Sequence, residues 1–246
     1  MKATGSTLDP AEVERFAAHA ASWWDPSGSF RPLHQLNPTR LSFLRQELIA
    51  HFGRNSRSLK PFEGLTLCDV GCGGGLIAEP MARLGFKVTG IDADDKAIAV
   101  ARTHASSSGL DVDYSSDTAE SLVHGTRLFD VVLALEIVEH VANPDAFLAA
   151  CGALVKPGGV FIGATLNRTP QSYALAIVGA EYVMRWLPRG THDWRRFLRP
   201  SEFVLGLRRA GLSATRLSGL RYRLTSGAWE LTDDLSVNYM LMAVKQ

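Results

Sequence analysis

Residues 65–75 place an apolar strand, an acid and a glycine-rich turn in direct succession. They read Leu-Thr-Leu-Cys-Asp-Val-Gly-Cys-Gly-Gly-Gly, and the pattern predicts a helix from Leu76 to Leu84. A strand that ends in such a turn lets the backbone come close to a nucleotide-like ligand. This stretch therefore restricts the chain to α/β folds that bind their ligand at the carboxyl end of a strand.

The spacing of the glycines indicates which ligand binds. A dinucleotide site needs G-x-G-x-x-G; Gly71 and Gly73 fit, but Leu76 stands in the sixth position and the third glycine comes early, at Gly75. Asp69 would repel a pyrophosphate and suits a cationic amino group. We infer S-adenosylmethionine (SAM), which carries an ammonium and a sulfonium but no phosphate.

Strands and helices alternate after this turn, which predicts a parallel, doubly wound sheet. Near the end, 212–217 and 236–244 read as strands joined by a loop, so we expect the last strand to be antiparallel. The prediction is a mostly parallel, seven-stranded, Rossmann-like α/β sheet. Its central strands are expected at 65–70, 87–91, 111–115, 129–135 and 160–165, with helices near 76–84, 94–108 and 144–154.

The chain is expected to have two parts. Residues 1–60 would form an N-terminal helical cap, with one helix from Asp9 to about Trp24 and another from Asn37-Pro38 to about Phe52. Residues 61–246 would form the SAM-binding domain, with an insertion at 166–200. The loop at Trp23-Trp24 could close the site, or it could serve only as a hydrophobic staple that packs against the first helix.

Bulk properties exclude some classes. The net charge of the 246 residues is +1, and the basic residues cluster with apolar ones, so we expect no nucleic-acid partner. The three cysteines, at 68, 72 and 151, lack metal spacing and fit a reducing compartment. Neither a signal peptide nor a membrane-spanning run is evident, which favours a cytoplasmic location.

Several motifs carry a resemblance to a known family. The glycine turn, Asp92 and Leu-Val-Lys-Pro-Gly-Gly at 154–159 resemble class I SAM-dependent methyltransferases. Further segments resemble the ubiquinone-biosynthesis O-methyltransferases, and these lie at 23–26, 32–41, 165–168, 178–194 and 236–240. The resemblance implies methylation of ring hydroxyls on polyprenylated phenol and catechol precursors of ubiquinone, the 3-demethylubiquinol and 2-polyprenyl-6-hydroxyphenol steps.

The expected cofactor site gathers residues at the ends of the first four strands. Asp69, Gly71 and Gly73 would hold the amino-acid end of SAM, and Asp92 would accept hydrogen bonds from both ribose hydroxyls. The resemblance implies that an arginine closes on the cofactor carboxylate. The remaining candidates are Asp117 near the adenine, Leu135 near the methionine part, and that arginine, Arg40.

The expected chemical site follows the fourth strand. If residues 136–140 turn as a helix, Glu136, Glu139 and His140 share one face. The resemblance implies that these positions bind a divalent ion such as Mg²⁺, which would polarise a catechol oxygen. Alternatively His140 acts as general base, or the acids and the histidine only orient loops around SAM. His192 is a second candidate for a base or a substrate contact.

The insertion is dense in apolar residues and arginine. We expect residues 173–199 to dock on an anionic membrane face and to admit the polyprenyl tail, which would place the protein peripherally on the inner membrane, on the matrix side in a mitochondrion. The alternative is an ordinary lid or a dimer helix. Other ubiquinone-biosynthesis proteins are possible partners. The arginines concerned are residues 168, 185, 189, 195, 196 and 199.

Two other functions remain open. One is a methyltransferase for a different small lipophilic acceptor, and the other is a non-catalytic membrane component that keeps SAM binding only as structure. Intact Asp69, Asp92, Glu136 and His140 argue against the second. An oxidoreductase is disfavoured by Leu76 and by the charge of Asp69.

Overall fold

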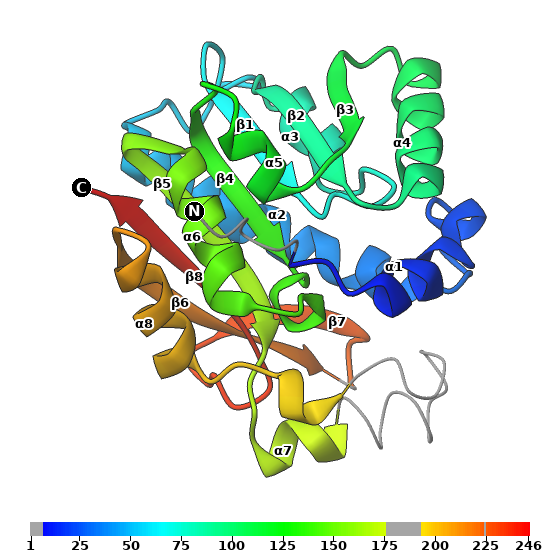
Figure 1. Cartoon of the computed structure of the whole chain (residues 1–246), viewed down its shortest axis with the longest axis vertical. Coiled ribbons are helices and arrows are strands. Elements are labelled where there is room, and N and C mark those ends of the chain that lie inside the picture. The colour runs from blue at the N-terminus through cyan, green and yellow to red at the C-terminus, as the bar shows by residue number, and fades with distance from the viewer. Residues whose placement is uncertain (1–6, 176–192, 224) are drawn as a thin grey trace.

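A single eight-stranded sheet organises the molecule (Figure 1). The computed structural model describes residues 7–175, 193–223 and 225–246. The strand order across the sheet is β3-β2-β1-β4-β5-β8-β6-β7. The strands are β1 (Thr66–Val70), β2 (Lys87–Asp92), β3 (Val112–Ser116), β4 (Phe129–Leu135), β5 (Val155–Leu166), β6 (Leu212–Arg223), β7 (Ala228–Thr232) and β8 (Asn238–Lys245).

β1 to β5 pair in parallel, and β7 and β8 run opposite to the other strands, which confirms the doubly wound α/β prediction with an antiparallel last strand. β8 enters between β5 and β6 and pairs antiparallel with both. The predicted strands at 212–217 and 236–244 correspond to β6 and β8. The structure adds one edge strand, β7, which pairs antiparallel with β6.

Helices cover both faces of the sheet because β-strand side chains alternate between the two faces. One hydrophobic cluster joins α2, α3 and α4 to residues such as Leu67 and Val131, and the other joins α5, α6 and α8 to neighbours such as Cys68 and Val132. The helices are α1 (Pro10–Ala17), α2 (Arg31–Phe52), α3 (Ala78–Arg83), α4 (Asp95–Ser107), α5 (Ala119–Val123), α6 (Pro144–Leu154), α7 (Pro170–Ser172) and α8 (Pro200–Arg209). Short 3-10 turns within the described residues are η1 (Ala20–Ser22), η2 (Val138–His140) and η4 (Trp194–Arg196).

The N-terminal helices differ from the prediction. α1 starts where expected, with the Asp9 side chain accepting a hydrogen bond from the Ala11 N–H, but it ends at Ala17. The second helix begins at Arg31, not at Asn37-Pro38, because Pro32 occupies its first turn, where proline is favoured. Pro38 lies inside the helix and leaves one backbone hydrogen bond unmade.

The fifth strand is longer than expected. The sequence 156–159 predicts a sharp turn before a strand at 160–165, whereas β5 already begins at Val155. Val155 pairs with Phe129, and pairing resumes after a register shift at Val160 and Val131. The proline and glycines therefore form an irregularity within the strand.

α2 is packed into the main core. Its side chains Phe43, Leu44 and Leu48 are buried in the same cluster as the sheet residues Leu67 and Val131. The division of the chain at residue 60 stays a prediction.

Candidate functional site

The glycine turn after β1 is held in place by the neighbouring strand. The backbone N–H groups of Gly71 and Cys72 both donate to the Ile91 carbonyl, at 2.8 and 3.0 Å. Gly71, Gly73 and Gly75 all have positive φ, between 52° and 90°, which side-chain-bearing residues rarely adopt. α3 starts at Ala78, two residues later than predicted, because the turn occupies those residues.

The tryptophan loop closes on this turn. A Cβ added to Gly73 would lie 2.4 Å from the Trp23 ring, and one on Gly74 would lie 2.5 Å from the same side chain. The Trp24 Nε1–H donates to the Gly74 carbonyl at 2.9 Å, and the Trp24 ring stacks on His104 with centroids 3.4 Å apart. Two of the glycines therefore leave room for an indole. These contacts favour a loop that closes over the glycine turn, and not one that serves only as a hydrophobic staple for the first helix.

Asp92 receives backbone N–H groups on both carboxylate oxygens. Gly73 donates to Oδ2 at 2.8 Å and Asp94 donates to Oδ1 at 2.9 Å. Each oxygen can accept a further hydrogen bond. This orientation at the end of β2 fits a pair of ribose hydroxyls.

Asp69 and Arg40 are opposite charges buried near the turn. Each is only 3% exposed. Burial raises the pKa of Asp69 to about 7, with the Asp92 carboxylate adding to the rise and Arg40 opposing it. Arg40 Nη2 lies 2.7 Å from Glu136 Oε1, and within the described part of the chain its Nε and Nη2 make no well-formed hydrogen bond. A buried carboxylate short of a cation and a buried guanidinium with spare donors fit the ammonium and carboxylate of SAM.

A pocket lies between the glycine turn and the N-terminal helix, and neither Asp69 nor Arg40 is among its lining residues. It lies at the carboxyl ends of the strands, where open α/β sheets bind their ligands. Asp117 lines it, and its carboxylate also accepts the Thr118 N–H at 2.9 Å. Leu135 packs against the larger hydrophobic cluster. Other lining residues are Asp9, Glu12, Phe16, Trp23, Gly71, Asp92, Ile137 and His140.

Residues 136–140 do not form the expected helical turn. Glu136 has a φ of +55°, and only Val138–His140 coil, as a 3-10 turn. The three candidate side chains therefore have separate partners. Glu136 faces Arg40, Glu139 Oε2 accepts the Thr165 hydroxyl at 2.9 Å, and His140 Nδ1 lies 2.8 Å from Glu12 Oε2.

This arrangement does not fit the expected metal. Glu139 is 3% exposed, and Glu136, Glu139 and His140 each face a different partner. Divalent ions prefer ionised oxygen donors that converge on one point. Among residues 7–175, 193–223 and 225–246, no group of three or more His, Cys, Asp or Glu is placed to hold an ion.

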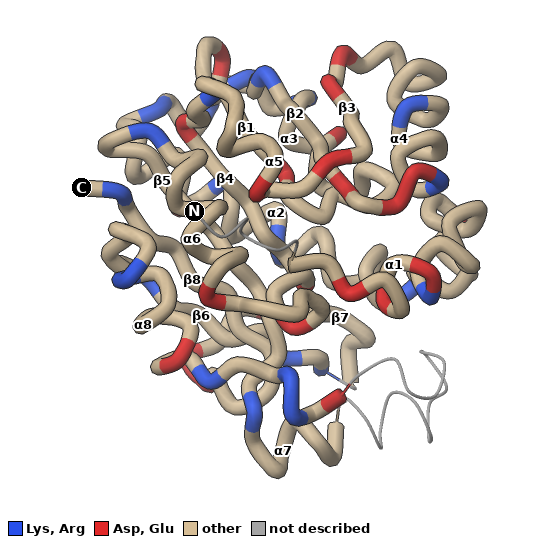
Figure 2. The backbone as a smooth tube through the Cα atoms, in the orientation of Figure 1, with Lys and Arg blue, Asp and Glu red and all other residues tan. Residues whose placement is uncertain are grey.

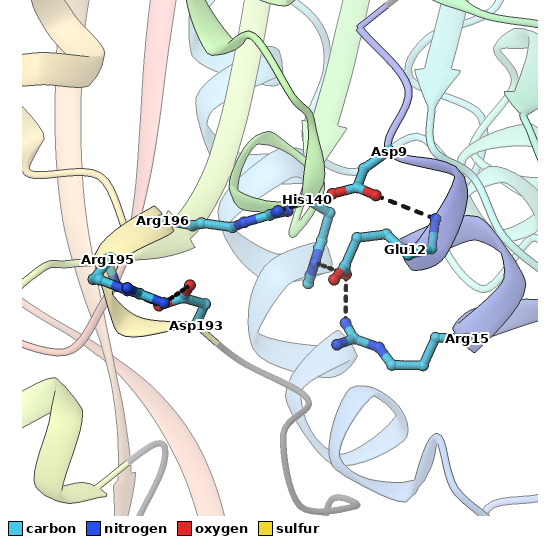
Figure 3. Close-up of polar contacts among 8 residues, drawn as sticks. Asp9, Glu12, Arg15, His140, Asp193, Arg195 and Arg196 are labelled. Atoms are coloured by element: carbon cyan, nitrogen blue, oxygen red, sulfur yellow. Dashed lines mark hydrogen bonds and ion pairs between the residues drawn. The ribbon is translucent and has the colours of Figure 1, made fainter.

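Glu12 is a site residue that the sequence did not reveal. Its carboxylate meets the His140 ring on one side and the Arg15 guanidinium on the other (Figure 3). Burial raises the pKa of Glu12, but the His140 hydrogen bond and the nearby cations lower it by a larger amount. The pKa of Glu12 is therefore below its ordinary value. No local pattern could have paired two residues 128 positions apart.

The described ends of the insertion carry paired arginines. Arg196 Nη2 lies 2.8 Å from Asp9, Arg195 Nη2 lies 3.0 Å from Asp193, and Arg168 pairs with Glu202. Figure 2 shows blue and red segments side by side near α7. His192 and most of the expected membrane segment, 176–192, lie outside the described residues. No helix in the described part of the chain is long and apolar enough to span a membrane.

Sequence comparison identifies close relatives. A methyltransferase-domain family model matches residues 68–163. A ubiquinone biosynthesis O-methyltransferase from Paramagnetospirillum magneticum is 56% identical over 97% of this chain and 96% of its own length. One from Cereibacter sphaeroides is 54% identical over 99% of both chains.

Solved structures share the fold at low sequence identity. The SAM-bound magnesium protoporphyrin IX methyltransferase from Synechocystis superposes with a TM-score of 0.65 at 16% identity, covering 99% of this chain and 100% of that one. The [4+2]-cyclase SpnF superposes with a TM-score of 0.57 at 19% identity, covering 82% and 80%. At these identities the likeness establishes the architecture alone.

Proposed function

The chain belongs to the ubiquinone biosynthesis O-methyltransferases, and from this membership we propose that it transfers the SAM methyl group to a ring hydroxyl of a polyprenylated phenol or catechol. The observation that carries the proposal is identity above 50% over nearly the full length of both chains.

SAM would bind across the carboxyl ends of β1 and β2. In this proposal Asp69 takes the ammonium, Arg40 the carboxylate and Asp92 the ribose hydroxyls. Buried charges need partners, and the zwitterionic amino-acid end of SAM supplies one to each of Asp69 and Arg40. Gly71 and Gly73 would hold the amino-acid end of SAM together with Asp69, with Asp117 near the adenine and Leu135 near the methionine part.

His140 is the proposed general base. It lines the same pocket as Gly71 and Asp92, so it lies beside the expected cofactor. As the acceptor oxygen attacks the methyl carbon in line with the sulfur, the C–S bond breaks and the hydroxyl proton passes to the imidazole. The products are the aryl methyl ether and S-adenosylhomocysteine. Glu136 would act beside this site through Arg40, and His192 remains a candidate for substrate contact.

A transfer assay tests the reaction. Labelled SAM is supplied with a short-chain polyprenyl catechol and, separately, with an unprenylated catechol. We expect label in the ether product, with a higher kcat/KM for the prenylated acceptor. Transfer only to unprenylated acceptors would favour the other small-acceptor function. Binding of S-adenosylhomocysteine in calorimetry without transfer to any acceptor would favour the non-catalytic component.

Membrane docking through residues 173–199 is a second part of the proposal. Tyr173 and Leu175 begin this segment, and both are large, apolar and about half exposed. Exposed apolar residues beside arginines suit an anionic interface.

Co-sedimentation with vesicles tests the docking. Leu175→Asp should weaken binding to anionic vesicles several-fold. The leucine side chain would enter the boundary between headgroups and acyl chains, where a carboxylate is unfavourable. Leu205→Asp is the matched control, because Leu205 is 46% exposed on α8, outside the segment. Equal loss in both variants, or no binding by the unaltered protein, would contradict docking through this segment.

A further inference from the structure

Helix α1 reaches two separate parts of the site from one of its faces. Asp9, at its N-cap, pairs with Arg196 at 2.8 Å. Glu12, one turn later, pairs with His140 at 2.8 Å (Figure 3). Residues three apart lie on the same side of a helix. One face of α1 therefore contacts both the loop after β4 and the described end of the insertion.

We propose that Glu12 is a positioning residue that holds the His140 ring in the tautomer and orientation needed for proton transfer. The inference rests on the proposed role of His140 as general base. Glu12 lines the same pocket, but in this proposal it acts through the imidazole and not on the cofactor or the acceptor.

The chemistry of the two groups gives the direction of the hydrogen bond. An ionised carboxylate can only accept hydrogen bonds, so Nδ1 of His140 must carry the hydrogen across the 2.8 Å contact. The lone pair of the neutral ring is then on Nε2, which is the nitrogen that takes the acceptor's proton. The imidazolium formed in that step is stabilised by the adjacent carboxylate, as in other carboxylate–histidine pairs.

The surroundings hold this pair in a fixed geometry. The Glu12 and His140 side chains are 18% and 12% exposed, so water competes little with their contact. Arg15 binds the same oxygen of Glu12, Oε2, from within the helix. The Phe16 ring meets the His140 ring edge to face with centroids 5.1 Å apart, which limits rotation of the imidazole.

Docking of α1 therefore supplies the Glu12 carboxylate that positions the His140 ring. Just before the helix, the Thr7 carbonyl accepts the Ala142 N–H at 2.7 Å, so the N-terminal segment also clamps the loop that carries His140. The base would be competent only while α1 is docked over the pocket. Cofactor entry and proton transfer would then depend on the same helix.

A comparison of two acceptors isolates the role of Glu12. Glu12→Gln and the control Glu14→Gln, an exposed acid on the same helix, are assayed with a prenylated catechol and with an electron-poor prenylated catechol that is already ionised at the assay pH. We expect E12Q to lower kcat on the order of 10- to 100-fold with the first acceptor. With the ionised acceptor it should stay within about threefold of the unaltered protein, because no proton has to be removed. E14Q should match the unaltered protein with both.

Two further readouts separate positioning from loss of structure. The affinity for S-adenosylhomocysteine should be unchanged in E12Q, since α1 stays docked. The ¹⁵N spectrum of the unaltered protein, with His140 assigned through His140→Gln, should show the tautomer with hydrogen on Nδ1.

The contrary results are distinct. An equal loss of kcat with both acceptors, or an Nε2–H tautomer in the unaltered protein, would overturn the positioning role. Absence of transfer by the unaltered protein to either acceptor would instead refute the proposed function, and the tautomer would still decide the role of Glu12.

Discussion

The buried carboxylate of Asp69 should make cofactor binding depend on pH near neutrality. Asp69 is 3% exposed, and burial raises its pKa to about 7. In the proposed site the ammonium of the ligand binds the ionised carboxylate of Asp69, so protonation of Asp69 would compete with binding. Affinity for the ligand should therefore be lost as pH falls through the raised pKa of Asp69 and be regained above it.

The size of the effect follows from the titration. With a pKa of about 7, the ionised fraction is roughly one in eleven at pH 6 and about one half at pH 7. The dissociation constant should therefore fall about fivefold between these pH values, or about 1 kcal/mol. The ligand's own α-amino group titrates above this pH range, so it stays largely protonated throughout.

Calorimetry with S-adenosylhomocysteine at pH 6 and pH 7 measures the change. Asp69→Asn should bind more weakly and show a nearly flat dependence. Asp113→Asn, an exposed acid on β3, should keep the fivefold change. A change of less than twofold in the unaltered protein, or a slope that survives in D69N, would refute the assignment to Asp69.

Two further predictions concern the closed turn and the strands that support it. Trp23→Ala should lower the free energy of unfolding by about 2 kcal/mol and weaken S-adenosylhomocysteine binding, because the indole covers Gly73 and Gly74. Urea denaturation measures the first effect and calorimetry the second. An unchanged affinity would contradict closure of the site by Trp23. Asp130→Asn should lower the free energy of unfolding by about 1–2 kcal/mol at pH 7. Burial raises the pKa of Asp130, but the Lys156 and Thr66 hydrogen bonds lower it by a larger amount, so the net pKa lies below the ordinary carboxyl value. The stabilisation by Asp130 is therefore present above the ordinary carboxyl pKa and is lost as pH falls through the lowered pKa. A stability gap that stays constant from pH 7 down to pH 3 would contradict this account.

The proposed cofactor half of the site could be assembled from the sequence because its signals are local. Asp69, the glycines of the turn and Asp92 lie at the ends of two successive apolar strands. The carboxyl ends of neighbouring parallel strands meet at one edge of a sheet, so the pattern alone places these residues together.

The proposed catalytic half was less accessible because its geometry depends on long-range contacts and on one backbone angle. The helical reading of 136–140 failed at Glu136, whose positive φ turns it toward Arg40. The contact between Glu12 and His140 joins elements that no period in the sequence relates. Asn37-Pro38 was a misleading signal, since an earlier proline already starts the helix.

The position of β8 in the sheet has a consequence for how the chain folds. β8 lies between β5 and β6, although it follows both in sequence. The β6–β7 hairpin can form early as a local unit, but it has no place in the sheet until residues 238–245 arrive. Closing β8 against β5 brings together residues such as Leu166 and Asn238 across a long stretch of chain, which slows folding. Completion of the sheet should therefore be a late kinetic event, and the waiting hairpin is the stretch of backbone most open to mispairing with another molecule.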